Sequence, residues 1–347
     1  MTRRKKLTVI AGCLAFVLLL GLMYIGLRAL DHKDRVTGGT EEYEDEYETD
    51  NDAEVIFGNN IYVLQHSVKS YLVMGTDASG NENKTGEDYQ GSMADFLMLM
   101  VIDETDKKYG FLELNRDTIT EIPMMDQDGD VIEYEDMQLC TAHWYGGSKI
   151  QSCQNTVDTV STFLHGAPVN GYLEIPIDHI SDLNHVLEGV EVTLEDDFST
   201  QDPAMTQGAT LTLTDEQAYI FLRSRMSVGD GENTSRMRRQ RAYLLAALNK
   251  ISSQNAGDAK FIAKAYKQIM EYATSDLSMN TITKLAKHLD EYENLGFIQI
   301  SGESTIGTDR VGDGKEHTEF IADEDSVKDA VFTLFPLVDS GIKVDDE

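Results

Sequence analysis

Three short apolar runs constrain the fold more than any other feature of the chain. They read "SYLVMG" (residues 70–75), "DFLMLMVID" (95–103) and "KYGFLEL" (108–114). Each run has the length and composition of a buried strand. The segment "ETDKK" joins the second run to the third, a length that suits a hairpin, so these two should be antiparallel. The sequence therefore predicts a sheet built around this hairpin.

Charged side chains gather where these predicted strands end. Asp77 follows the first run, Asp95 opens the second, and "NRDT" (115–118) follows the third. If the loop 78–94 returns the chain antiparallel, all three places fall on one edge of the sheet. We expect that edge to hold two carboxylates and Arg116.

The remaining segments alternate between helical and extended patterns. Such alternation indicates an α/β or α+β fold in which helices cover a sheet. Thr214 is a plausible N-cap for one of the helices. Helical periodicity marks residues 151–166, 177–188, 215–223, 236–250, 258–273, 281–292 and 324–335, and strand patterns mark 170–178, 189–194, 297–302 and 317–323.

An uncharged apolar run, residues 7–27, stands near the start of the chain. As a helix it would be about 30 Å long, the thickness of the hydrocarbon core of a bilayer. A cleaved secretory signal is the alternative, but such signals have a shorter apolar region and a small-residue cleavage site. Four basic residues, 3–6, precede the run. The sequence thus predicts a single-pass plasma-membrane protein with a cytoplasmic N-terminus and an extracellular remainder.

An acidic polar segment follows this anchor. Residues 31–54 lack hydrophobic periodicity, so we expect a disordered tether. The predicted organisation is an anchor (1–30), this tether (31–54), an extracellular catalytic domain (55–250) and a C-terminal part (251–347) that completes the domain or is appended to it. The formal net charge of −32 argues against nucleic acid as a partner.

A cluster of arginines contrasts with this acidity. Residues 223–248 contain six arginines and no lysine. On the helix expected from residue 236, with Thr234 or Ser235 as its cap, Arg236, Arg239 and Tyr243 share one face. Guanidinium groups around a helix start suit phosphate or pyrophosphate. The alternative is that these arginines form salt bridges with carboxylates of the protein itself.

The cysteines agree with an extracellular location. Cys13 lies in the apolar run, which leaves Cys140 and Cys153 as a candidate disulfide, with a reduced buried pair as the alternative. His143 lies between them without the spacing of a zinc site, so we expect a packed or hydrogen-bonded side chain.

Six motifs occur in an order that resembles the LytR-CpsA-Psr family. They are "MGTD", "ADFLML", "NRDT", "AHWYGG", "LTDEQAYIFLRSR" and "GDGENTSRMRRQR", spread over residues 70–248. The resemblance implies an α-β-α sandwich with a mixed central sheet and an apolar groove for a polyprenyl chain. It also implies a membrane-anchored extracellular phosphotransferase that moves a glycopolymer from an undecaprenyl-pyrophosphate carrier to peptidoglycan. Mg²⁺, or Mn²⁺ in its place, would be the cofactor, and pyrophosphatase activity a side reaction.

The resemblance also assigns roles to residues of this sequence. Asp77 and Asp95 match the metal-binding carboxylates. The positions that match pyrophosphate-binding arginines are Arg116, Arg223, Arg225, Arg236 and Arg239. The positions with an expected catalytic role are Arg116, Asp117 and Asp230. Two family arginines are missing, because Ala78 and Met93 occupy their places.

Two other classes of function stay open. The missing arginines favour a non-catalytic polyprenyl-pyrophosphate binder or envelope regulator. The acidic stretch "DQDGD" (126–130) suggests a calcium-stabilised adhesion protein, although it lacks the spacing of an EF-hand.

Overall fold

A computed structural model describes residues 53–77, 84–224, 228–229, 233–250, 270–277, 292–307, 310 and 314–344. The chain divides into two compact units, each of which we describe by itself. The sheet unit comprises Thr49–Ile177, Ala273–Asp276 and Phe297–Glu347. The helix unit comprises Met1–Glu48, Asp178–Tyr272 and Leu277–Gly296.

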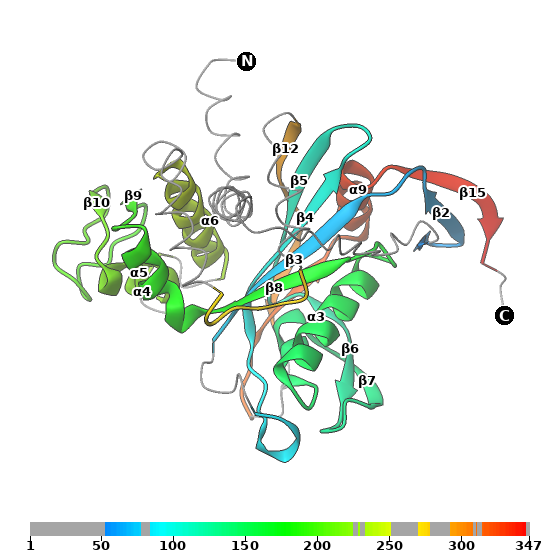
Figure 1. Cartoon of the computed structure of the whole chain (residues 1–347), viewed down its shortest axis with the longest axis horizontal. Helices are drawn as coiled ribbons and strands as arrows, with labels where there is room; N and C mark the ends of the chain where they lie inside the picture. The colour runs from blue at the N-terminus through cyan, green and yellow to red at the C-terminus, as the bar shows by residue number, and fades with distance from the viewer. Residues whose placement is uncertain are drawn as a thin grey trace, which may run out of the picture. The chain divides into compact units, whose positions relative to one another are not determined.

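A six-stranded mixed sheet forms the centre of the sheet unit (Figure 1). Its order is β11-β8-β3-β4-β5-β12. The bounds are β3 (Lys69–Thr76), β4 (Ala94–Asp103), β5 (Lys108–Leu114), β8 (Gly171–Pro176), β11 (Thr274–Ser275) and β12 (Glu293–Gln299). β4 is antiparallel to both β3 and β5, and β8 is parallel to β3. The predicted hairpin and the expectation of a mixed sheet are confirmed.

The sheet is buried because its strands carry apolar side chains at nearly every position. Leu72, Leu99 and Leu112, from three adjacent strands, are fully buried. α3 (Lys149–Phe163) contacts β8 and β11, and α9 (Glu324–Leu334) contacts β5. Ser148 caps α3, since its side chain accepts a hydrogen bond from the Gln151 amide. These helices lie where residues 151–166 and 324–335 predict them.

Three smaller sheets surround this core. β1 (Glu54–Phe57), β2 (Asn60–Leu64) and β15 (Leu337–Lys343) form one sheet, β6 (Ile119–Met125) and β7 (Val131–Gln138) the second, and β13 (Gly302–Ile306) and β14 (Thr318–Ala322) the third. The "DQDGD" stretch makes the β6–β7 turn, where the Asp126 carboxylate accepts hydrogen bonds from the amides of Asp128 and Asp130. The short helix η2 (Leu139–Trp144) follows β7.

The helix unit contains α4 (Ile180–Val186), α5 (Asp215–Arg223), α6 (Asn233–Lys250) and the pair β9 (Glu191–Thr193) and β10 (Thr210–Thr212). Phe198, Phe221 and Tyr243 are buried in its core. Thr214 caps α5, as predicted, in a capping box with Gln217. The predicted cap of α6 is wrong: the helix begins at Asn233, so Thr234 and Ser235 lie inside its first turn.

Several predictions concern residues outside the described part of the chain. They include the apolar run 7–27, the tether up to residue 52, and most of the helical patterns 258–273 and 281–292. Among the described residues, no helix is both long and apolar enough to cross a bilayer.

Candidate functional site

A β-bulge places Asp95 at the edge of the central sheet. Gly75 pairs with Phe96 and Thr76 pairs with Ala94, so the register shifts at Asp95, which is the extra residue of the bulge. Bulges re-aim a side chain and are common beside active sites. The close backbone approach also explains Gly75, where a Cβ would lie 3.0 Å from the Cβ of Phe96. The bulge therefore re-aims the Asp95 side chain at the strand end.

Arg116, just past the end of β5, pairs with Asp95. Its Nη1 donates to Asp95 Oδ1, and its Nε lies 3.2 Å from Asp117 Oδ1. Burial opposes the charge of Arg116, but nearby Cys140, Asp117 and Asp77 raise the pKa of the guanidinium. Arg116 is only 8% exposed. Because two carboxylates contact its guanidinium, the side chain is held in place as a cation.

Asp77 is hydrogen-bonded to Met93, the residue that precedes β4. Its amide donates to the Met93 carbonyl, and its Oδ1 accepts from the Met93 amide at 3.1 Å. Asp77 and Asp95 thus flank Met93 on adjacent chain segments. The edge predicted from the sequence, with two carboxylates and one arginine, is present in the structure.

The charges of this cluster suit a divalent cation. Among the described residues of the sheet unit, the carboxylates of Asp77, Asp95 and Asp117 accompany the guanidinium of Arg116, which leaves an excess of two negative charges. Mg²⁺ prefers carboxylate oxygens and is commonly held by one or two of them together with substrate phosphates. Asp77 and Asp95 therefore fit the predicted metal site, and their metal-binding role stays a prediction.

A buried ion pair between Lys149 and Glu174 lies next to Thr76, the last residue of β3. It was not predicted from the sequence. Lys149 Nζ lies 3.0 Å from Glu174 Oε2, and Thr76 donates to the other oxygen of Glu174. Glu174 is fully buried, and burial raises the pKa of its carboxyl despite the nearby Lys149. The pair ties the first turn of α3 to β8 and to the residue before Asp77. Glu174 lies within an apolar strand pattern, and nothing in the sequence around it identifies Lys149 as its partner.

Cys140 and Cys153 are thiols and do not form the candidate disulfide. The reason lies in their neighbours. Cys153 Sγ lies 3.6 Å from His143 Nε2, whereas Cys140 lies beside Arg116 and helps to raise its pKa. The alternative, a reduced buried pair, is the arrangement that the structure has, and His143 is the packed, hydrogen-bonded side chain that the sequence predicts.

The arginines of the helix unit fall into two groups. Arg236 and Arg239 are buried on α6, on the face that the sequence predicts for them. Arg223, at the end of α5, is exposed; its Nη1 lies 3.1 Å from Asp178 Oδ1 and its guanidinium lies over the ring of Tyr219. Arg225 and Asp230, as well as Ala78, lie outside the described residues.

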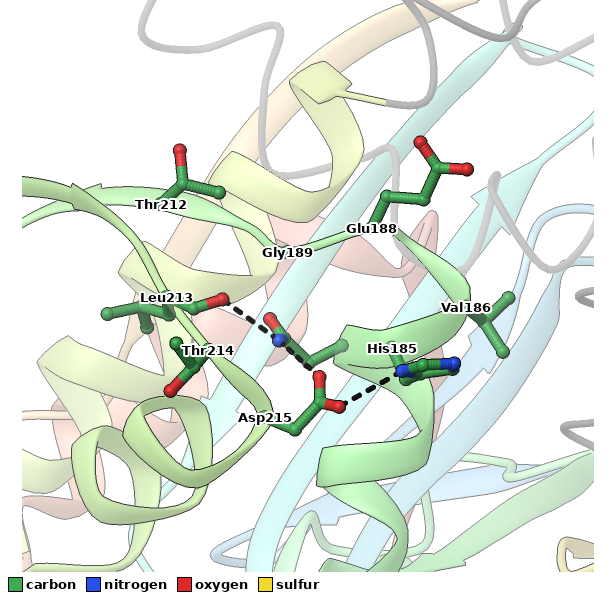
Figure 2. Close-up of a pocket in the computed structure, with 9 residues that line it drawn as sticks. His185, Val186, Glu188, Gly189, Thr212, Leu213, Thr214 and Asp215 are labelled. Carbon is green, nitrogen blue, oxygen red and sulfur yellow. Dashed lines mark hydrogen bonds and ion pairs between the residues drawn. The ribbon is translucent and has the colours of Figure 1, made fainter.

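A pocket of about 510 Å³ in the helix unit contains none of the predicted site residues. Figure 2 shows its lining, where Asn184 donates to the Leu213 carbonyl and to Asp215, which also pairs with His185. Asn184 is itself held by Tyr243, whose hydroxyl donates to its amide oxygen. These polar groups hydrogen-bond to one another and so link α4 to α5. The described residues that line the pocket therefore show no set of side chains arranged for catalysis.

Comparison with known proteins identifies the family. The profile of the LytR_cpsA_psr family matches residues 35–331. The chain belongs to the LytR-CpsA-Psr family. The match extends well beyond the six motifs of residues 70–248 that carry the sequence resemblance.

Relatives found by sequence include named teichoic acid transferases. The chain is 27% identical over 237 residues to TagU of Halalkalibacterium halodurans, covering 68% of this chain and 70% of that protein. It is likewise 27% identical to TagU of Bacillus cereus, covering 70% and 72%. Both are named polyisoprenyl-teichoic acid–peptidoglycan teichoic acid transferases.

Solved structures of the family share the fold. Protein gbs0355 from Streptococcus agalactiae superposes with a TM-score of 0.60 at 21% identity, over 77% of this chain and 86% of that chain. TagV of B. subtilis gives 0.57 at 20% identity, over 77% and 95%. TagT bound to the ligand LIIa-WTA gives 0.54 at 21% identity, over 77% and 89%. At these identities the likeness shows the fold alone.

Met93 occupies a position where the family resemblance leads us to expect an arginine. Its sulfur lies 3.0 Å from Arg116 Nη2, so a neutral thioether contacts the guanidinium there.

Proposed function

We propose that this chain is a membrane-anchored extracellular phosphotransferase that moves a glycopolymer from an undecaprenyl-pyrophosphate carrier to peptidoglycan. Membership of the family and the names of its relatives support the transferase class. The observation that carries the proposal is the buried Arg116, fixed between Asp95 and Asp117 at the bulged strand end. Arg116 Nη2 donates to the Met93 thioether, a weak acceptor that a phosphoryl oxygen can replace, so this guanidinium can stabilise charge that develops on a phosphoryl group.

The reaction is a displacement at phosphorus. A hydroxyl oxygen of peptidoglycan forms a bond to the sugar-linked phosphorus, and the bond from that phosphorus to the bridging oxygen breaks. Polyprenyl phosphate leaves with the electron pair, and the hydroxyl proton goes to a base. Mg²⁺, when bound by Asp77 and Asp95, would neutralise phosphate charge. Since catalysis of phosphoryl transfer is mostly positioning and charge stabilisation, Arg116 is expected to matter most in the transition state.

The structure describes Asp117, one of the two acids with an expected catalytic role. Asp117 is 3% exposed and ion-paired with Arg116 Nε, so it is suited to hold the guanidinium. The role of Asp230, as the base that takes the hydroxyl proton, stays a prediction. Arg223, Arg225 and Arg236 stay predicted pyrophosphate ligands.

The test is transfer by the full-length chain in detergent. The donor is a disaccharide on a polyprenyl pyrophosphate, the acceptor a peptidoglycan oligomer, and the readouts are the glycosylated acceptor and released polyprenyl phosphate. Arg116→Ala and Asp95→Ala should each reduce transfer at least about a thousandfold, as loss of a key charge contact does. Asp106→Ala, an exposed carboxylate in the β4–β5 turn, is the matched control and should keep wild-type activity. Transfer retained by both site variants would refute the site.

Met93 is the specific observation in favour of a second function. A non-catalytic polyprenyl-pyrophosphate binder needs the fixed Arg116 but can lack a second arginine at position 93. Binding of the disaccharide polyprenyl-pyrophosphate donor by the full-length chain, without release of polyprenyl phosphate in the presence of the acceptor at any Mg²⁺ concentration, would select this function.

A further inference from the structure

Arg239 is enclosed by acceptors that belong to the protein. It is 2% exposed, and its donors are engaged on every side. Nε donates to the Phe221 carbonyl at 3.1 Å, Nη1 lies 2.9 Å from Asp196 Oδ2, and Nη2 donates to the Ser224 carbonyl. The guanidinium also lies over the ring of Phe198, 5.5 Å from its centroid. A side chain held in this way has little capacity left to take a phosphate ligand.

The acceptors of Arg239 identify what it does. Phe221 and Ser224 stand at the last turn of α5, where carbonyl groups have no partner within the helix. A cation at this end also interacts favourably with the helix dipole. Arg239 of α6 therefore caps the C-terminus of α5, the helix that ends at Arg223.

Asp196 is the acid that keeps Arg239 in place. It is 8% exposed, and its Oδ1 also accepts from Arg238 Nη2 at 3.3 Å. The chain at Gly229 approaches so closely that a Cβ there would lie 3.0 Å from Asp196 Oδ1. Asp196 thus contacts the start of α6 and a residue of the segment between α5 and α6. An Asp paired with a fork-shaped guanidinium fixes both position and orientation.

Arg223 shows the contrasting situation. Its side chain is 41% exposed and pairs with Asp178, which is also exposed. Exposed ion pairs are weak, so the Arg223 guanidinium can exchange its contact with Asp178 for a contact with a bound anion. The two arginines are adjacent in the fold but differ in what they are able to bind.

We propose that Arg239 and Asp196 are positioning residues: they fix the end of α5, and so hold Arg223 where it binds pyrophosphate. Arg239 itself does not bind the ligand, in contrast to the role that the family resemblance assigns to it. This inference rests on the proposed function, because it takes pyrophosphate as the ligand of Arg223.

The experiment measures binding of geranyl pyrophosphate with Mg²⁺ by isothermal titration calorimetry, with the full-length chain in detergent. Arg239→Lys keeps the charge but loses the fork, and Asp196→Asn keeps the shape but loses the charge. Each should weaken binding about tenfold, and the double variant should lose less than the sum of the two single losses, since both substitutions remove the contact between Arg239 and Asp196. Asp196→Glu should recover part of the affinity. Arg241→Lys, two residues further along α6 and so on another face of the helix, is the matched control and should bind like the wild type.

A double-mutant cycle with Arg223→Ala decides between a positioning and a direct role. If Arg239 acts through Arg223, Arg239→Lys should change the Kd less than about twofold in the Arg223→Ala background. Additive losses would show that Arg239 is itself a ligand and would overturn the inference. A lower unfolding midpoint with an unchanged Kd would reduce Arg239 to a purely structural role and would overturn it as well. Absence of binding by the wild type would instead refute the proposed function, and the inference with it.

Discussion

The buried imidazole of His143 should make the protein sensitive to mild acid. His143 lies in η2, where Nδ1 is 3.1 Å from the Ser92 carbonyl and Nε2 is 3.6 Å from Cys153 Sγ. A neutral ring satisfies both contacts, with Nδ1–H donating to Ser92 and Nε2 accepting from the thiol. Burial, together with the nearby charge of Lys149, lowers the pKa of His143 from 6.5 to about 4.

The sign and size of the effect follow from this pKa. Between about pH 4 and 6.5 the unfolded chain binds a proton at His143 that the folded chain does not. The stabilising contribution is therefore complete above pH 6.5 and is lost as the pH falls towards 4. The difference between the unfolded-state and folded-state pKa values of His143 corresponds to about 3 kcal/mol of free energy of unfolding. That loss is a large fraction of the stability of an ordinary domain, about 5 to 15 kcal/mol.

The assay is urea unfolding of the full-length chain in detergent, from about pH 7 to about pH 4.5. Trp144, the single tryptophan, neighbours His143 and reports the transition by fluorescence. His143→Gln can keep both hydrogen bonds but cannot titrate, so the difference between wild type and variant isolates this group. Over this pH range the wild type should lose about 2.4 kcal/mol more than the variant. His185→Gln, at an exposed histidine, is the control and should follow the wild type. Parallel curves for His143→Gln and wild type would refute the reasoning, as would a midpoint near 6.5 in an NMR titration of the His143 ring.

Two other predictions concern buried polar groups of the sheet unit. Lys149→Met leaves the Glu174 carboxylate buried without its cation and should cost about 3 to 5 kcal/mol in urea unfolding, whereas adding Glu174→Gln should recover most of this. Because burial raises the pKa of Glu174, the defect of the single variant should grow as the pH rises, and a defect that is independent of pH would contradict this account. Cys140 and Cys153 should both be alkylated by maleimide in the denatured, unreduced chain, so that mass spectrometry finds three additions with Cys13; one addition would indicate a disulfide.

The strands of the central sheet could be predicted because each is a local apolar run. β3, β4 and β5 carry their burial signal within single segments, and their ends fix where Asp77, Asp95 and Arg116 must meet. β7 escaped prediction because its first six residues are exposed and read as a polar loop. Its turn, "DQDGD", left a calcium-stabilised protein open as an alternative, because carboxylates that hydrogen-bond the backbone look the same in sequence as carboxylates that bind ions.

Features that depend on two distant segments could not be predicted. The bulge at Asp95 depends on the register between β3 and β4, which the sequence of either strand alone does not determine. The pair of Lys149 and Glu174 joins a helix to a strand, and only the packing shows that both are buried. The disulfide prediction used the compartment and the number of cysteines, but the direction in which each thiol points is set by its neighbours.

The arginine cluster shows why composition alone cannot assign a ligand. Absence of lysine from residues 223–241 favours groups that need a planar fork, and a diphosphate is one such group. The C-terminus of a helix is another, since Arg239 uses the same fork on two carbonyls and a carboxylate. In a chain with a net charge of −32, an arginine meets carboxylates more readily than it meets a ligand. Burial and the occupation of each donor therefore have to separate the two uses, and by that criterion Arg223 is suited to bind an anion whereas Arg239 supports it.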